Sequence, residues 1–274
     1  MAVVTIGLQI GSLGLELGRL LAQELRYQFV SPPEIIAEAA RRYQLKPEQF
    51  QLVDERQPRF WERLRTDSIR ISAYFRAVAL ERAAAGNAVI VGRSIPSLIP
   101  NGTREALKIL AVAPVKTRIE QVMRGEKLDA TAAERRVHHF DQEMRSWISL
   151  MQGMDIDDPA NYDLVVNTGL RPLPQIAASV IALVKPIEHA SDAISRQAVT
   201  DLCTSAQVRA ALMAHPKIGH AAITVETEQG VVTLRSSSLV APWDDLAVAV
   251  VRQVKGVKDV RLEVEVPPPP LRSE

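Results

Sequence analysis

Three scarcities narrow the functions open to this chain. It has one cysteine in 274 residues, Cys203, which excludes an internal disulfide and a cysteine-rich metal site. Its 33 basic and 32 acidic residues nearly balance, so no basic field favours a nucleic-acid partner. No apolar run is long enough to span a bilayer, and the first residues lack the basic and apolar regions of a signal peptide. We therefore expect a cytoplasmic protein in a reducing compartment, without a transmembrane segment.

Short apolar runs alternate with helix-like segments along the first two thirds of the chain. Such alternation is typical of a parallel sheet joined by right-handed crossovers. The predicted fold class is α/β, with a five-stranded parallel sheet and flanking helices. The predicted strands are 3–10, 27–30, 88–92, 107–113 and 163–167. The main predicted helices are 33–43, 68–85, 130–151 and 174–184.

The last third of the chain follows a different pattern. The polar stretch 185–191 comes after a complete helix, so we predict one domain over 1–188 and a second over 192–266. The second domain reads as α-β-β-α-β, with a hairpin turn at Gln229-Gly230. This order predicts a small α+β domain with its own core and one sheet face open to solvent. Residues 267–274 form a Pro-rich tail.

Two predicted strands end in features that favour phosphate binding. The first leads into Gly11-Ser12-Leu13-Gly14, a glycine-rich turn that opens a helix. Glycines let backbone N–H groups approach an anion at a helix N-terminus. The third strand ends in Gly92, and Arg93 follows at the sheet edge where open α/β proteins bind ligands. The alternatives are an ordinary turn and a surface arginine paired with a carboxylate.

These features belong to a series of segments that resembles a known family. Over about 1–184 the chain resembles the cytidylate kinase-like family of P-loop nucleoside-monophosphate kinases. The resemblance implies transfer of the γ-phosphoryl group of ATP to CMP or a similar monophosphate, with Mg²⁺. The segments that carry it are 11–14, 86–93, 112–124, 157–159 and 162–168.

The second domain resembles a BON domain over about 196–266. The runs 223–235 and 254–260 carry this resemblance. BON domains are generally regarded as interaction modules, so the resemblance implies a protein or membrane-surface partner and no chemistry.

The kinase resemblance also implies roles for single residues. Gly11, Ser12 and Gly14 would form the phosphate loop, and Arg93 would bind the phosphate of the acceptor nucleotide. No metal ligands are predicted among the protein side chains, because His138-His139 lack a third ligand at a suitable spacing.

Three basic residues on or after the helix near 116 are predicted to be catalytic: Arg118, Arg124 and Lys127. In related kinases, arginines near the lid stabilise charge on the transferring phosphoryl group. Asp141 would lie on helix 130–151 and hold one of the nucleotide-binding arginines in place. For the basic residues, the alternative is a solvated helix face.

The chain departs from the family pattern at several positions. Leu8 and Leu15 stand where the family usually has arginines that replace the Walker lysine, and Leu13 stands where it usually has glycine. The result is a degenerate Walker A loop. Met144 replaces a further expected arginine, and Arg145 is rotated by about 100° from that helical position.

Three functional hypotheses remain open from the sequence. The first is a nucleotide-binding protein with a degenerate phosphate loop, which senses or scaffolds through its BON domain. The second is an active nucleoside-monophosphate kinase that uses ATP and Mg²⁺. The third is a pure protein-interaction module.

Overall fold

The computed structural model describes residues 1–46, 65–219, 223–236 and 243–264. The predicted tail 267–274 and the last two residues of the strand predicted through 266 lie outside these ranges. The strands of the first part are β1 (Val3–Leu8), β2 (Gln28–Val30), β3 (Ala88–Val91), β4 (Ala106–Val112) and β5 (Leu164–Asn167). The helices of this part are α1 (Gly14–Leu25), α2 (Pro32–Arg42), α3 (Arg65–Ala85), α4 (Val115–Glu126), α5 (Ala130–Gln152) and α6 (Leu173–Ala190).

The five strands form one sheet in the order β2-β3-β1-β4-β5, and every neighbouring pair is parallel. The predicted α/β class and the five-stranded parallel sheet are therefore confirmed. All carboxyl ends meet at one edge, so the turn after β1 and Arg93 after β3 lie on the same side of the sheet. This edge is where the sequence predicts a phosphate site.

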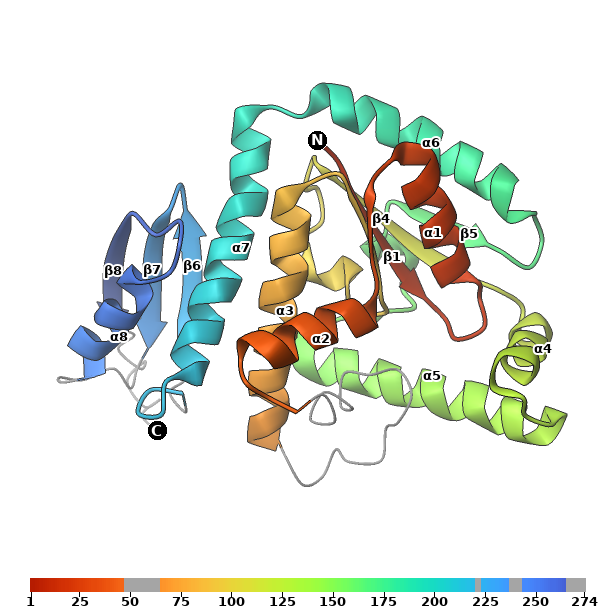
Figure 1. Cartoon of the computed structure of the whole chain (residues 1–274), viewed down its shortest axis with the longest axis horizontal. Coiled ribbons are helices and arrows are strands. Elements are labelled where there is room, and N and C mark those ends of the chain that lie inside the picture. Colours follow the sequence, from red (N-terminus) through yellow and green to blue (C-terminus); the bar gives the residue numbers. More distant parts are fainter. Residues whose placement is uncertain (47–64, 220–222, 237–242, 265–274) are drawn as a thin grey trace, which may run out of the picture.

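Helices cover both faces of this sheet, as Figure 1 shows. On one face, Leu17 and Leu21 of α1 share a core with Val180 of α6 and the side chains of β1 and β4. On the other face, α2 and α3 pack on Val3 and Ile90. The apolar strands are buried from both sides, which accounts for their nearly continuous hydrophobic sequences.

The last third forms a second, three-stranded sheet in the order β6-β7-β8. The hairpin of β6 and β7 turns at Gln229 and Gly230, whose φ values of 50° and 83° are those of a tight two-residue hairpin loop. The predicted α-β-β-α-β order is confirmed. Leu262, predicted to face the core, is 39% exposed because it lies on the edge strand β8. The elements are α7 (Ala193–Ala214), β6 (Thr224–Glu228), β7 (Val231–Ser236), α8 (Trp243–Arg252) and β8 (Asp259–Val264).

Helix α7 belongs to two hydrophobic cores at once. One of its faces supplies Val208 and Leu212 to the core of the second sheet. Its opposite face supplies Val199, Cys203 and Ala210 to the first core, against α3, so α7 lies between α3 and β6 (Figure 1). The second part thus closes a core as predicted, but its first helix also completes the core of the first part.

The junction between the two parts is short. Helix α6, predicted to end at 184, continues to Ala190, so only Ser191 and Asp192 separate it from α7. Asp192 begins α7 with a side chain that accepts from the Ser195 backbone N–H at 2.8 Å, which stabilises the helix start. Burial at the α3–α7 contact raises the pKa of the Cys203 thiol to about 11, so it stays protonated at neutral pH.

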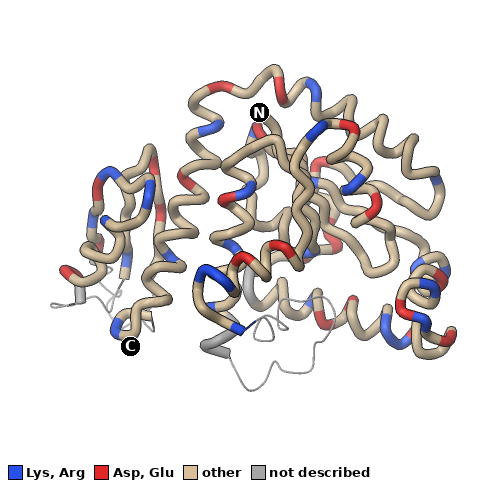
Figure 2. Tube along the Cα trace, in the orientation of Figure 1, with Lys and Arg blue, Asp and Glu red and all other residues tan. Residues whose placement is uncertain are grey.

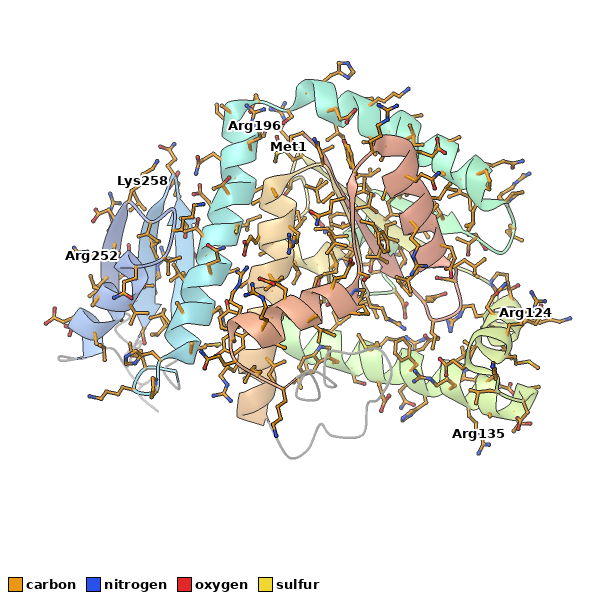
Figure 3. All side chains as sticks on the ribbon, viewed as in Figure 1. Met1, Arg124, Arg135, Arg196, Arg252 and Lys258 are labelled. Carbon is orange, nitrogen blue, oxygen red and sulfur yellow. The ribbon has the colours of Figure 1, made fainter. Side chains whose placement is uncertain are left out.

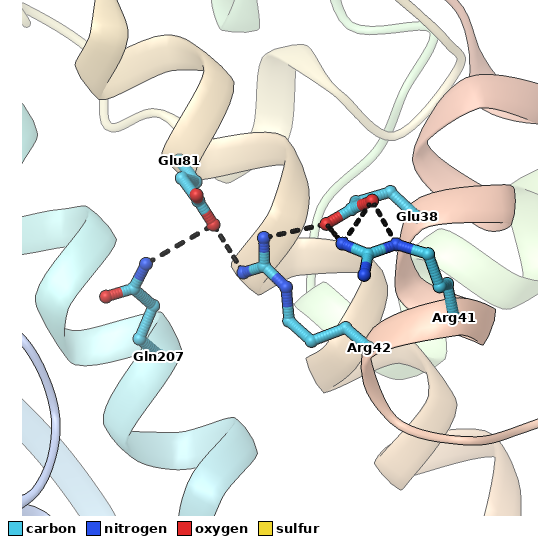
Figure 4. Close-up of polar contacts among 5 residues, drawn as sticks. All are labelled: Glu38, Arg41, Arg42, Glu81 and Gln207. Atoms are coloured by element: carbon cyan, nitrogen blue, oxygen red, sulfur yellow. Dashed lines mark hydrogen bonds and ion pairs between the residues drawn. The ribbon is translucent and has the colours of Figure 1, made fainter.

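A chain of polar contacts runs across three helices beside this contact (Figure 4). Arg42 of α2 pairs with Glu38 at 3.0 Å and with Glu81 of α3. Gln207 of α7 donates to the same Glu81 carboxylate at 3.4 Å. Glu38 also pairs with Arg41 at 2.8 Å. The chain links α2 and α3 of the first part to α7 of the second.

Charges are distributed over both parts. Figure 2 shows basic and acidic residues interspersed along most elements, in line with the balanced composition. Within the described ranges, no helix is both long enough and apolar enough to cross a membrane.

Candidate nucleotide site

The turn after β1 is held tightly at the carboxyl edge of the first sheet. The Ser12 N–H donates to the Gln9 carbonyl at 3.0 Å. The Thr168 hydroxyl, at the end of β5, donates to the Ser12 carbonyl at 2.5 Å and so joins the turn to the far side of the sheet. A Cβ on Gly11 would stand 2.4 Å from the Arg118 carbonyl oxygen, so only glycine allows α4 to pack this closely.

Leu13 occupies the N-cap position of α1 in a left-handed conformation, with φ 56° and ψ 24°. This conformation costs a residue with a Cβ about 1–2 kcal/mol, and glycine adopts it freely. The leucine supplies no side-chain cap for the helix. The backbone of the turn therefore has a left-handed conformation that favours glycine, with a leucine in that position.

Two leucines beside the turn, Leu8 and Leu15, pack against the core. Leu8 is 6% exposed, and a Cβ on Gly14 would stand 2.7 Å from the Leu8 Cβ. Leu15 packs at the edge of the same core. Neither side chain can donate to a phosphate. The Ser12 hydroxyl is buried and has no hydrogen-bond partner among the described residues.

Two arginines meet one carboxylate beside this turn. Arg93 follows Gly92, whose φ of 155° is strained for other residues and turns the chain at the end of β3. Its Nη1 lies 3.3 Å from Asp141 Oδ1, and Arg118 Nη2 lies 2.6 Å from Asp141 Oδ2. The structure thus brings together Arg93, Arg118 and Asp141, from β3, α4 and α5, as an Arg93–Asp141–Arg118 cluster.

The cluster is buried and carries one more positive than negative charge. The Arg93 and Arg118 side chains are 3% and 2% exposed, and that of Asp141 is 12% exposed. Burial lowers the pKa of the Arg118 guanidinium; Asp141 opposes this effect, and the neighbouring Arg93 charge adds to it. Arg118 Nε has no hydrogen-bond partner among the described residues. A buried, unsatisfied guanidinium N–H favours binding of an anion.

Two aromatic residues that the sequence did not single out, Phe140 and Tyr162, complete the surroundings of the cluster. The Phe140 ring has Arg93 4.8 Å and Arg136 5.3 Å from its centroid, a cation–π arrangement that packs both guanidiniums. The Tyr162 hydroxyl donates to the Ile156 carbonyl at 2.8 Å, and burial raises the pKa of this phenol to about 12. The position of Phe140 next to Asp141 was the only sequence signal for its role.

Arg145 lies closer to the cluster than its rotation from position 144 suggested. It stands one helical turn after Asp141, a spacing that puts the two on one face of α5. Its Nε pairs with Asp157 at 2.5 Å, and this hydrogen bond and the charges of Asp157 and Asp141 raise its pKa. Arg145 is thus a cation whose charge interacts with Asp141, although it is rotated by about 100° from position 144.

The other two basic residues predicted to be catalytic lie away from the cluster. Arg124 is exposed near the end of α4 and projects outward from the molecule (Figure 3). Lys127 is exposed and ends α4 in a left-handed conformation, with φ 55°. In this structure both belong to a solvated tip formed by α4 and α5, and their catalytic roles stay predictions.

Comparison with known proteins identifies the family. The sequence profile of the cytidylate kinase-like family matches residues 3–170, more than half of the chain. The chain belongs to this family. The BON domain profile matches residues 200–235, which confirms the second resemblance and covers most of α7, all of β6 and most of β7.

Curated relatives include cytidylate kinases of archaea. That of Pyrococcus horikoshii is 26% identical over 195 residues, which cover 71% of this chain and 94% of the relative. That of Methanocaldococcus jannaschii is 23% identical over 167 residues, covering 61% and 88%. An uncharacterized protein of Eubacterium ventriosum has a similar fold, with a TM-score of 0.50 at 16% identity over 68% of this chain and 99% of that protein.

Proposed function

We propose that this chain is a cytoplasmic nucleotide-binding protein that senses or scaffolds through its BON domain. It holds CMP or a similar monophosphate at the Arg93–Asp141–Arg118 cluster and binds ATP weakly. The observation that carries the proposal is a contrast within one sheet edge. The acceptor side keeps two buried arginines around Asp141, whereas the loop side has leucines where cations are needed.

The acceptor side suits a single phosphate. Its excess positive charge and the unpaired Arg118 N–H call for an acceptor with negative charge. Asp141 already holds both guanidiniums in place, so less conformational entropy is lost when a phosphate binds. The position of the cluster at the carboxyl ends of the strands agrees with where α/β proteins bind ligands.

The donor side does not suit a tightly held triphosphate. The loop offers backbone N–H groups, one orphaned hydroxyl on Ser12 and no side-chain cation. When bound, ATP with Mg²⁺ would supply the phosphoryl group, and the chain's residues would have to neutralise it. Loss of one such cation from phosphoryl transfer costs on the order of a thousandfold in rate. We therefore expect binding without efficient turnover.

The deciding experiment pairs calorimetric titrations of the full chain with a turnover assay. CMP, other monophosphates and ATP with Mg²⁺ are titrated separately, and ADP formation is followed with ATP and CMP together. Monophosphate binding without turnover supports the proposal. Turnover would instead support the alternative of an active monophosphate kinase, and no nucleotide binding at all would favour a pure protein-interaction module.

The first prediction concerns Arg93. We expect Arg93→Ala to weaken CMP binding by about tenfold to a hundredfold, since a charged hydrogen bond contributes roughly 1.5–3 kcal/mol. Calorimetric titration measures the change. Arg252→Ala, on the distant helix α8, is the matched control and should bind CMP like the parent. Equal affinity of the two variants would refute the assignment of Arg93.

The second prediction restores the loop. Leu13→Gly with Leu15→Arg removes the strained leucine and adds a cation whose stem can lie along the core edge. We expect ATP affinity to rise about tenfold or more, because one charged hydrogen bond is gained. Leu20→Arg on the same helix is the control and should leave ATP affinity unchanged. Low-micromolar ATP binding by the unaltered protein would contradict the degenerate-loop argument.

A further inference from the structure

A large groove lies between the two parts of the chain, far from the nucleotide site. It has a volume of about 1130 Å³, and α3, α7, the segment 98–105 and the polar face of the second sheet form its walls. The segment 98–105 precedes β4, so the groove lies at the amino edge of the first sheet. The Arg93–Asp141–Arg118 cluster lies at the carboxyl edge. The groove is therefore a separate feature, slightly larger than the usual range of small-molecule sites, about 300–1,000 Å³.

Small side chains along the α3–α7 contact leave this space open. Ser72 and Ala73 of α3 face Ala198, Ser205 and Ala206 of α7 along the groove. Larger residues at these positions would fill it. The second sheet stands back from α3 because α7 lies between them (Figure 1).

Two arginines line this space without pairing to any of the carboxylates around it in the described part of the chain. These carboxylates are Glu105, Asp192, Asp201, Glu226, Glu228 and Glu263. Arg76 of α3 and Arg209 of α7 both line the groove. Burial lowers the pKa of the Arg76 guanidinium, and the positive charge of Arg209 lowers it further. Neither has a hydrogen bond or ion pair to any residue in the described part of the chain. Two like charges brought together, one of them desolvated, destabilise the protein unless something else uses them.

The other arginine–carboxylate contacts of the groove show that pairing is available nearby. Arg235 pairs with Glu226 at 2.5 Å and with Glu263 at 2.6 Å, so its charge is already met. Glu105 also lines the groove, is fully buried, and has no hydrogen-bond partner for either carboxylate oxygen among the described residues. Arg76 and Arg209 thus differ from Arg235, because their guanidinium N–H groups line the groove without a partner among the described residues.

We propose that this groove binds a phosphate-bearing ligand through Arg76 and Arg209. Two guanidiniums from neighbouring helices can each donate a pair of hydrogen bonds to phosphate oxygens, and the anion removes their mutual repulsion. The volume admits a phosphorylated metabolite. The phosphate can belong to a soluble molecule or to a lipid headgroup, and the test separates the two sources.

The test uses inorganic pyrophosphate and phosphatidylglycerol vesicles on the full chain. Because pyrophosphate also suits the nucleotide site, both titrations are made in the Arg93→Ala background. We expect the further double change Arg76→Gln with Arg209→Gln to weaken pyrophosphate binding by about tenfold to a hundredfold, the loss of charged hydrogen bonds. Arg252→Gln, made instead of the double change, should leave binding unchanged.

Three outcomes decide the proposal. Pyrophosphate binding that the double change removes supports a soluble ligand. Vesicle binding that the double change removes, without pyrophosphate binding, assigns the phosphate to a lipid headgroup. The proposal is overturned if neither probe binds, or if the double change leaves the binding of both probes intact. These results are independent of the CMP titrations, which report on Arg93.

A stability measurement separates a ligand site from a structural pair. Without ligand, the Arg76→Gln, Arg209→Gln protein should melt about 2–4 °C higher than its parent, since the repulsion between the two guanidiniums is relieved. In the Arg93→Ala background, pyrophosphate should raise the melting temperature only of the protein that keeps Arg76 and Arg209. A lower melting temperature for the double variant would show that the arginines stabilise the fold, and would count against the site.

Discussion

Replacing Asp141 by alanine is expected to destabilise the protein by about 3–5 kcal/mol, the cost of leaving buried charges without their partner. Arg93 and Arg118 both lie against this carboxylate, and both are almost fully buried. Without it, two guanidiniums would face each other in a desolvated site. The free energy of unfolding, measured by urea titration, gives the size of the effect.

The control for this change is Asp157→Ala. Asp157 pairs with Arg145 at 2.5 Å, but its side chain is 34% exposed and that of Arg145 is 53% exposed. Exposed pairs contribute about 0–1 kcal/mol, so a small loss is expected. High phosphate should restore part of the stability of Asp141→Ala, because an anion can take the place of the carboxylate. Equal losses for the two variants would show that the cluster is not the buried charge centre described above.

Cutting the chain before α7 is expected to unfold the first part. Residues 1–191 lack Val199, Cys203 and Ala210, which complete the core against α3. Fully burying one large apolar side chain contributes roughly 1.5–3 kcal/mol, so the loss is on the order of 5 kcal/mol. That is comparable to the whole stability of many domains, about 5–15 kcal/mol.

The matched fragment is 1–219, which keeps α7 and removes the second sheet. We expect 1–219 to unfold cooperatively on heating and 1–191 to show no cooperative transition, as followed by circular dichroism. A folded 1–191 fragment with unchanged CMP affinity would show that α7 is dispensable for the first part. It would also show that the second part can be deleted without consequence for nucleotide binding.

The regular elements of the first part were predictable because each is decided locally. The apolar strands at 88–92 and 107–113 stand within one residue of β3 and β4, since turn residues close them on both sides. The two-residue turn at Gln229-Gly230 was equally plain. The end of α6 was missed, because Pro186 inside a helix and the polar residues after it suggest a boundary.

The double role of α7 had a sequence signal that was not used. Helix α3 carries buried residues on all sides, among them Ile71, Phe75, Val78 and Leu80. A helix that is apolar all round must be covered on both sides. The sheet covers one side only, so a second covering element had to come from elsewhere in the chain. The sequence did not identify α7 as that covering element, because α7 lies far from α3 in the sequence.

The candidate site was predictable in part for the same reason. The strand ends place Gly11 and Arg93 by local pattern, and the structure brings Arg118 and Asp141 to Arg93. Arg124 and Lys127 were grouped with Arg118 through the family resemblance, and their catalytic roles stay predictions. The approach of Arg76 to Arg209 depends on how α3 packs against α7, and no local pattern reports that packing.

The sharing of α7 between two cores also matters while the protein is being made. Helix α3 is synthesised roughly a hundred residues before α7. At about 5–20 residues per second, α7 follows after a delay of about 5–20 s. Throughout that interval the apolar outer face of α3 has no cover. The exposed apolar face makes the nascent chain prone to aggregate during this interval. We therefore expect a chaperone that binds apolar helices to associate with the chain during translation.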